Sequence, residues 1–224
     1  MRFANREDAG RQLAAHLTEY ANRADVVVLG LPRGGVPVAA EIAGRLHAPL
    51  DVLVVRKLGV PGYAELAMGA IASGGVQVLN ADVIEQTGIS PAAVAHAAAR
   101  ERVELERRER AFRAGRAPMS VSGRVVLLVD DGLATGATME AGIAGLRQLQ
   151  PASIVVVVPV GAPESCSRVR RHADRFVCLQ QPPFFQAVGE WYEDFSQTTD
   201  EEVQRLLEEA RTRMQGAAAS VASS

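Results

Sequence analysis

The segment at residues 125–139, VVLLVDDGLATGATM, constrains this chain more than any other. Its first five residues are valine or leucine, which is typical of a strand covered on both faces in a parallel sheet. Asp130 and Asp131 follow directly. Because open α/β sheets bind ligands beyond the carboxyl ends of their strands, we expect both carboxylates to face a ligand.

The residues after this acid pair favour an anion. The loop at 134–138 has small side chains that let its backbone approach an anion closely, and its two threonines add hydroxyl donors. A helix is predicted over residues 138–149, and its unpaired N-terminal amides favour a phosphate. Carboxylates accept hydrogen bonds and therefore suit a vicinal diol. The segment predicts a phosphorylated sugar as ligand, whereas the acid pair alone would also fit an aspartate-capped turn.

A second anion loop is predicted after the strand at residues 25–31. Here Arg33 is followed by Gly34 and Gly35. The glycines expose backbone amides, and the arginine offers a planar fork of donors that fits a phosphate group. We expect this loop to lie beside the acid pair, although the same residues also suit a plain turn between strand and helix.

A third strand is predicted at residues 51–56 and leads into Lys57, the only lysine of the chain. A glycine- and proline-containing loop follows it. A surface lysine without function is the alternative interpretation. The usual nucleoside triphosphate and dinucleotide loops, Gly-Lys-Ser/Thr and G-x-G-x-x-G, do not occur in the sequence.

The order of apolar strand, acid pair, threonine-containing loop and helix closely resembles the 5-phosphoribosyl-1-pyrophosphate (PRPP) motif of type I phosphoribosyltransferases. The LATGATM part is most similar to the adenine phosphoribosyltransferases. Arg33-Gly34 resembles the pyrophosphate loop of the purine enzymes, and Arg56-Lys57 resembles the start of the flexible loop that covers PRPP. The resemblance spans residues 25–179 and implies a five-stranded parallel sheet with helices on both faces and a small hood.

The resemblance also implies a role for each matching residue. The acid pair would hold the ribose hydroxyls and stabilise the charge that develops on the sugar. Mg²⁺ would bind mainly through PRPP, and the protein groups that could also ligate it are the carboxylates of Asp130 and Asp131. The 5-phosphate would bind to Ala134, Thr135, Gly136, Ala137 and Thr138. The pyrophosphate would bind to Arg33, Gly34, Gly35, Arg56 and Lys57.

The acceptor is less well defined by these motifs. Purine enzymes of this family place carboxylates at positions that correspond to Ala67 and Ala134, and this chain has neither. The acidic candidates left are Glu65 in the loop, which we take as the catalytic candidate, and Glu193 or Asp194 near the C-terminus. Phe184 and Phe185 are candidates for stacking on a base, because they belong to a segment, residues 180–195, that holds five of the ten aromatic residues. A lid or a homodimer contact is the other interpretation of this segment.

Composition supports one compact domain. We expect a domain at residues 1–215, with its core at 25–179, its hood at 180–198 and a disordered tail at 216–224. A net charge of −2 argues against general nucleic-acid binding, and no stretch is apolar enough to span a membrane. No signal region precedes the first helix, expected at 7–20, so a cytoplasmic location is predicted. Two isolated cysteines suggest reduced thiols.

These observations predict a cytoplasmic transferase of nucleotide salvage that moves the 5-phosphoribosyl group of PRPP to a nucleobase and releases pyrophosphate. The alternative is a regulatory protein of the same fold that binds PRPP or a nucleotide without turnover. An ancillary competence-type protein with another acceptor is a third interpretation. A separate DNA-binding helix-turn-helix, which such a regulator usually needs, is not evident before Asp25.

Overall fold

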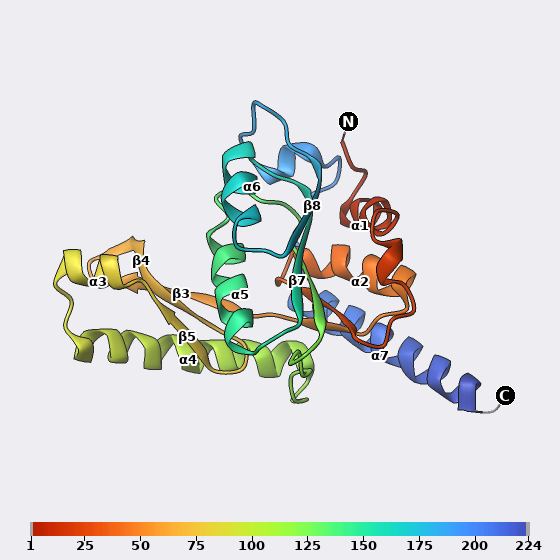
Figure 1. Ribbon diagram of the computed structural model, residues 1–224, viewed down its shortest axis with the longest axis horizontal. Helices are drawn as coiled ribbons and strands as arrows, with labels where there is room; N and C mark the ends of the chain where they lie inside the picture. Colours follow the sequence, from red (N-terminus) through yellow and green to blue (C-terminus); the bar gives the residue numbers. More distant parts are fainter. Residues whose placement is uncertain (1, 223–224) are drawn as a thin grey trace.

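The computed structural model describes residues 2–222 and is built around a five-stranded parallel sheet (Figure 1). The strand order is β2-β1-β6-β7-β8. The strands are β1 (Val26–Gly30), β2 (Leu50–Val52), β6 (Val125–Val129), β7 (Ser153–Val160) and β8 (Arg175–Gln180). All their pairings are parallel, as the valine-rich runs predict. The order reverses between β1 and β6, so these two strands flank the switch point at which such sheets bind ligands.

Helices cover both faces of this sheet. Alternate residues of each strand point to opposite faces, so β6 contributes Leu127 to one apolar core and Leu128 to the other. On the first face lie α1 (Arg6–Ala14), α2 (Gly35–Leu46) and α7 (Asp200–Ala222), and on the second lie α5 (Ala137–Gln148) and α6 (Pro163–Arg170). The predicted α/β core with helices on both faces is confirmed.

A second, antiparallel sheet projects to one side of this core (Figure 1). It consists of β3 (Val55–Val60), β4 (Tyr63–Ala72) and β5 (Val76–Leu79), and it is followed by α3 (Ala81–Thr87) and α4 (Pro91–Arg113). The single strand predicted at residues 51–56 is wrong, because the chain leaves the parallel sheet after β2 and starts β3 at Val55. The segment at 58–69, predicted as a loop, is mostly a β-hairpin.

A buried ion pair links the parallel sheet to α4, the helix that packs against the antiparallel sheet. Arg113, at the end of α4, donates from Nε to Asp51 Oδ1 at 2.8 Å and from Nη2 to the carbonyl oxygen of Val52 at 2.7 Å. Its Nη1 donates to Glu109 at 2.8 Å. Both Arg113 and Asp51 are buried, so the end of α4 is anchored to β2 of the parallel sheet.

The N-terminal segment meets the hood (Figure 1). Phe3 forms an isolated parallel bridge with Tyr192, next to the short 3₁₀ helix η2 (Val188–Trp191). Another 3₁₀ turn, η1 (Thr18–Tyr20), follows α1, which ends at Ala14 and is shorter than predicted. No helix within residues 2–222 has the length and apolarity needed to cross a membrane.

The last helix, α7, extends to Ala222, within the segment at 216–224 for which a disordered tail was expected. Its final turns are rich in alanine, the strongest helix former. Ser223 and Ser224, the end of the tail predicted to be disordered, lie outside the described residues.

Candidate functional site

The acid pair lies at the switch point of the parallel sheet. Asp130 and Asp131 follow β6 directly, and the last residue of that strand, Val129, is paired with Gly30 at the end of β1. The backbone amide of Asp131 donates to Asp130 Oδ1 at 2.9 Å, which orients the first carboxylate. The side chain of Asp131 is 15% exposed. Both acids therefore lie where a ligand of this fold is expected.

The loop after β1 lies against the acid pair, as predicted. A Cβ atom on Gly34 would be 2.0 Å from Asp131 Oδ2, and one on Gly35 would be 2.6 Å from the carbonyl oxygen of Val129. Only glycine leaves room for these close approaches. Arg33, joined to Pro32 by a cis peptide bond, is 40% exposed and lies 3.5 Å from Asp200 at the start of α7.

Arg6, from the first turn of α1, reaches the acid pair from the other side. Its Nε donates to Asp131 Oδ2 at 2.8 Å, and its Nη1 donates to the carbonyl oxygen of Ser196 at 2.7 Å. The guanidinium also lies 4.0 Å from the centre of the Phe195 ring. Tyr192 completes the contact between hood and site, because its hydroxyl donates to the backbone oxygen of Asp131 at 2.6 Å.

Burial dominates the electrostatics of the acid pair. It raises the pKa of Asp130 well above the usual value, and the neighbouring Asp131 adds to the rise. Burial also raises the pKa of Asp131, although the charge of Arg6 and its hydrogen bond partly offset the effect. The pair thus lies in a low-dielectric environment where its charge has a strong effect on a bound group.

The predicted phosphate loop is exposed and held from behind by α6. Ser165 Oγ donates to the carbonyl oxygen of Ala134 at 2.6 Å. Arg168 donates to the carbonyl oxygen of Thr135 and pairs with Glu140 at 2.6 Å. Gly136, with φ of +77°, turns the chain into α5, whose first amides have no acceptor within the helix. These amides form a site suited to an anion.

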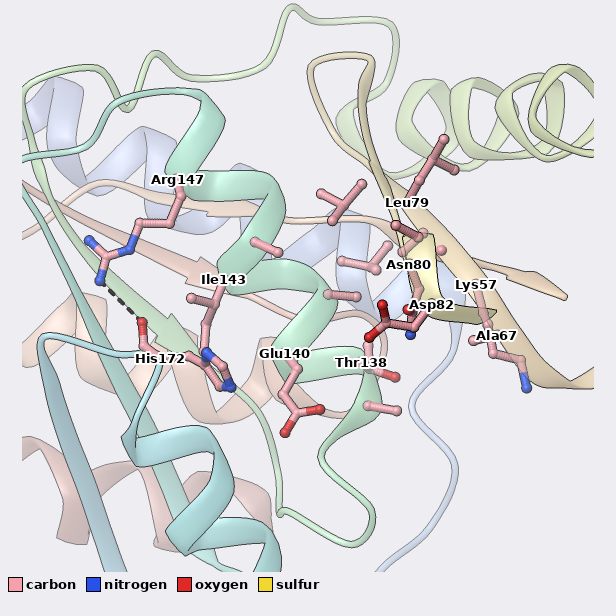
Figure 2. Close-up of a pocket in the computed structure, with 18 of the residues that line it drawn as sticks. Lys57, Ala67, Leu79, Asn80, Asp82, Thr138, Glu140, Ile143, Arg147 and His172 are labelled. Carbon is pink, nitrogen blue, oxygen red and sulfur yellow. Dashed lines mark hydrogen bonds between the residues drawn. The ribbon is translucent and has the colours of Figure 1, made fainter. Parts of the chain in front are cut away.

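A cleft of about 840 Å³ separates α5 from the antiparallel sheet (Figure 2). Lys57 and Thr138 lie toward one end, while Arg147 and His172 lie at the other, where Arg147 Nη2 donates to the carbonyl oxygen of His172. Lys57 therefore faces the start of α5. Asp130 and Asp131 do not line this cleft. The predicted sugar site at the acid pair and the cleft that contains Lys57 are therefore adjoining surfaces.

The structure does not bring every predicted residue to the site. Neighbouring residues of a strand point to opposite faces, so Arg56 turns away from the cleft and pairs with Glu101 of α4, its Nη2 2.5 Å from Glu101 Oε2. Phe184 is 89% exposed, whereas Phe185 packs with the apolar cluster around Phe3. The side chain of Glu65 lies outside what the structure describes.

Sequence reasoning missed the two residues that connect the hood to the acid pair. Arg6 is separated from Asp131 by 125 positions, and Tyr192 by 61. The aromatic cluster indicated that the C-terminal segment had a role, but no local pattern could have indicated Arg6. Among the residues that the structure describes, no three His, Cys, Asp or Glu side chains are grouped so as to hold a metal ion.

Comparisons with known proteins agree with this geometry. Residues 3–195 match the family model of the phosphoribosyl transferase domain. A Mycobacterium tuberculosis protein, named provisionally as a phosphoribosyl transferase, is 50% identical over 208 residues, which cover 93% of this chain and 47% of that protein. The chain thus spans about half the length of the curated relatives it matches.

Solved structures share the fold. The crystal structure of TT1426 from Thermus thermophilus is 44% identical and has a TM-score of 0.84, with 93% of this chain and 99% of that chain covered. The AQ2163 protein of Aquifex aeolicus, at 12% identity and a TM-score of 0.51, covers 82% of this chain and 78% of its own and shows the fold alone. Sequence and structure together establish that the chain belongs to the phosphoribosyl transferase family.

Proposed function

We propose that this protein transfers the 5-phosphoribosyl group of PRPP to a nitrogen acceptor, a nucleobase in the simplest case, and releases pyrophosphate. The observation that carries the proposal is the contact between the first predicted anion loop and the acid pair. Gly34 and Asp131 approach so closely that only a glycine fits between the first loop and the second acid. Sugar and pyrophosphate sites would therefore be neighbours, as cleavage of the bond between them requires.

The residues present define what each part would do. Asp130 and Asp131 accept hydrogen bonds from the ribose hydroxyls, and their charge stabilises the positive charge that develops on the ring as pyrophosphate leaves. The amides at the start of α5 and the loop at 134–138 hold the 5-phosphate and orient the sugar. The bond from the anomeric carbon to the pyrophosphate oxygen breaks, and a bond from that carbon to the acceptor nitrogen forms.

Two cationic side chains are placed to bind the leaving group. Arg33 is on the loop after β1, and Lys57 is on the opposite wall, in β3. Arg56 is less suited to this role, because it is paired with Glu101. The chemistry of the donors fits Mg²⁺, since carboxylate oxygens are ligands that it prefers, and two carboxylates would leave most of its positions to water and PRPP. When bound, the ion would supply positive charge to the pyrophosphate.

The experiment that tests this function is Mg²⁺-dependent release of pyrophosphate from PRPP with adenine, hypoxanthine, guanine, xanthine, uracil and orotate in turn. Release with one base, and its loss in Asp131→Asn, would support the proposal and identify the acceptor. Binding of PRPP with no release from any base would favour a regulatory protein or another acceptor. Failure of PRPP to bind would overturn the proposal.

A further inference from the structure

The position of Arg6 is not explained by the proposed chemistry. Its Nε donates to Asp131 Oδ2 at 2.8 Å, an oxygen of the same carboxylate that the proposed reaction assigns to the sugar. The side chain is only 11% exposed, so it is built into the site rather than resting on its surface. A ribose hydroxyl that donates to Asp131 Oδ2 would have to fit beside this guanidinium or displace it.

Two further contacts of Arg6 are with the hood. The guanidinium stacks on Phe195 at 4.0 Å and donates to the backbone oxygen of Ser196 at 2.7 Å. Phe195 in turn lies 5.0 Å from the ring of Tyr192, between ring centres, and packs closely on Gly189 of η2. A displacement of Arg6 would therefore be felt by the aromatic residues of the hood.

We propose that Arg6 is a positioning residue that couples the sugar site to the hood. A diol that binds to Asp131 displaces the Arg6 guanidinium, and the segment around Phe195 and Ser196 moves with it. The inference rests on the proposed function, since it takes the sugar of PRPP as the ligand of the acid pair. Its consequence is that the hood changes conformation when a sugar occupies the acid pair.

The chain contains its own reporter for this movement. Trp191, the only tryptophan, lies in η2 beside Tyr192. Its indole nitrogen is buried and has no hydrogen-bond partner among the described residues, so its emission should respond when the surrounding hood shifts or admits water. The backbone oxygen of Trp191 accepts from the amide of Phe3 at 2.8 Å, which ties it to the segment that leads into Arg6.

The experiment measures PRPP binding by calorimetry and Trp191 emission in parallel, with Mg²⁺ present. In the wild type, PRPP and ribose 5-phosphate should change the emission, whereas inorganic phosphate, which has no diol, should not. The Arg6→Gln variant should still bind PRPP, with a dissociation constant that is at most about tenfold higher than that of the wild type. It should lose the emission change. Arg6→Lys, which keeps the charge, should restore part of it.

Matched variants keep the test decisive. Arg11→Gln, on the same helix but 58% exposed and 3.9 Å from its partners, should bind and respond as wild type does. If Arg6→Gln fails to fold, Phe195→Leu removes the stacking and keeps the Asp131 contact, and it should bind PRPP with a reduced response. A full emission change in both variants, or none in a wild type that binds PRPP, would overturn the coupling. A wild type that binds no PRPP would overturn the proposed function instead.

Discussion

The parallel and the antiparallel sheet contribute to the site in different ways. In the parallel sheet, β1 and β6 are fully buried, and they hold the loop after β1 in contact with the acid pair. In the antiparallel sheet, β3 begins with two half-buried residues, Val55 and Arg56, and then exposes Lys57. The first sheet fixes geometry through packing, whereas the second presents a cation across a cleft.

The difference predicts that substitutions in the two regions will have separable effects. Changes near the parallel sheet should alter both stability and sugar binding, because packing and site share the same residues. Changes on the exposed side of the antiparallel sheet should alter anion binding alone.

The largest expected effect on stability comes from the ion pair that links α4 to the parallel sheet. Arg113→Ala should lower the free energy of unfolding by about 3–5 kcal/mol, because Asp51 would be left buried without its partner. Chemical denaturation would measure the loss. Arg110→Ala, an exposed change on the same helix, is the control and should cost about 0.5 kcal/mol or less. Equal stability of the two variants would show that the ion pair does not hold α4 to the parallel sheet.

The acid pair should show the largest effect on activity. Asp131→Asn should lower the rate of pyrophosphate release about 100-fold, because the side chain would no longer carry the charge that stabilises the ribose ring. Asp25→Asn is the matched control at the opposite end of β1, where the exposed carboxylate pairs with Arg23 at 2.7 Å. Wild-type rates in Asp131→Asn would remove this residue from the mechanism.

The contact between loop and acid can be tested by adding one methyl group. Gly34→Ala should destabilise the fold by about 1–3 kcal/mol and weaken PRPP binding, because the new Cβ would lie 2.0 Å from Asp131 Oδ2. Melting temperature and calorimetry would measure the two effects. Gly216→Ala, where a Cβ meets no atom within 4 Å, should produce neither. Normal PRPP affinity in Gly34→Ala would contradict the shared site.

Lys57 tests the antiparallel side of the comparison. Lys57→Ala should weaken PRPP binding about tenfold, the loss of one charge-assisted hydrogen bond, and should leave the melting temperature nearly unchanged because the residue is exposed. Lys57→Arg should retain most of the affinity. An unaltered dissociation constant in the alanine variant would return Lys57 to the role of a surface residue.

Substitution of Asp130 should have the smallest effect, and it should raise the stability of the fold rather than lower it. Its pKa is raised by burial and by Asp131, so its contribution to stability is most favourable below the unfolded pKa, about 3.9, and is lost as pH rises through the folded value. Asp130→Asn, which can still accept from the Asp131 amide, should therefore raise the melting temperature at neutral pH and less so in acid.

The control for Asp130 is a carboxylate whose pKa is shifted the other way. Asp174 has a lowered pKa because of its hydrogen bond to Arg147, so Asp174→Asn should lower the melting temperature at neutral pH. A lower melting temperature in both variants would mean that Asp130 stabilises the fold, and the cost inferred from its burial would be wrong.

Sequence patterns predicted the parts of the fold that depend on local chemistry. The valine and leucine runs at 25–31 and 125–129 predicted β1 and β6, and the helix predicted at 138–149 matches α5 to within a residue at each end. The antiparallel sheet was only partly predicted. Its pairing shifts register around Gly59, so the alternation that indicates a strand is broken there.

The candidate site was also only partly predicted, because sequence patterns report local chemistry. Loops that follow buried strands could be placed beside one another, because parallel strands end at one edge of a sheet. Arg6, Tyr192 and the outward turn of Arg56 depend on contacts between distant segments, which no local pattern records.

The contact between the N-terminal segment and the hood has a consequence for how the site is assembled. The hydrogen bond from Arg6 to Ser196 closes a loop of 190 positions, the most distant contact described around the acid pair. Contacts of such separation form late in folding, since the chain between them must be ordered first. During synthesis the phosphate loop and both acids can therefore fold before the hood has left the ribosome. An N-terminal fusion would adjoin the hood, so a C-terminal tag is the better choice for expression.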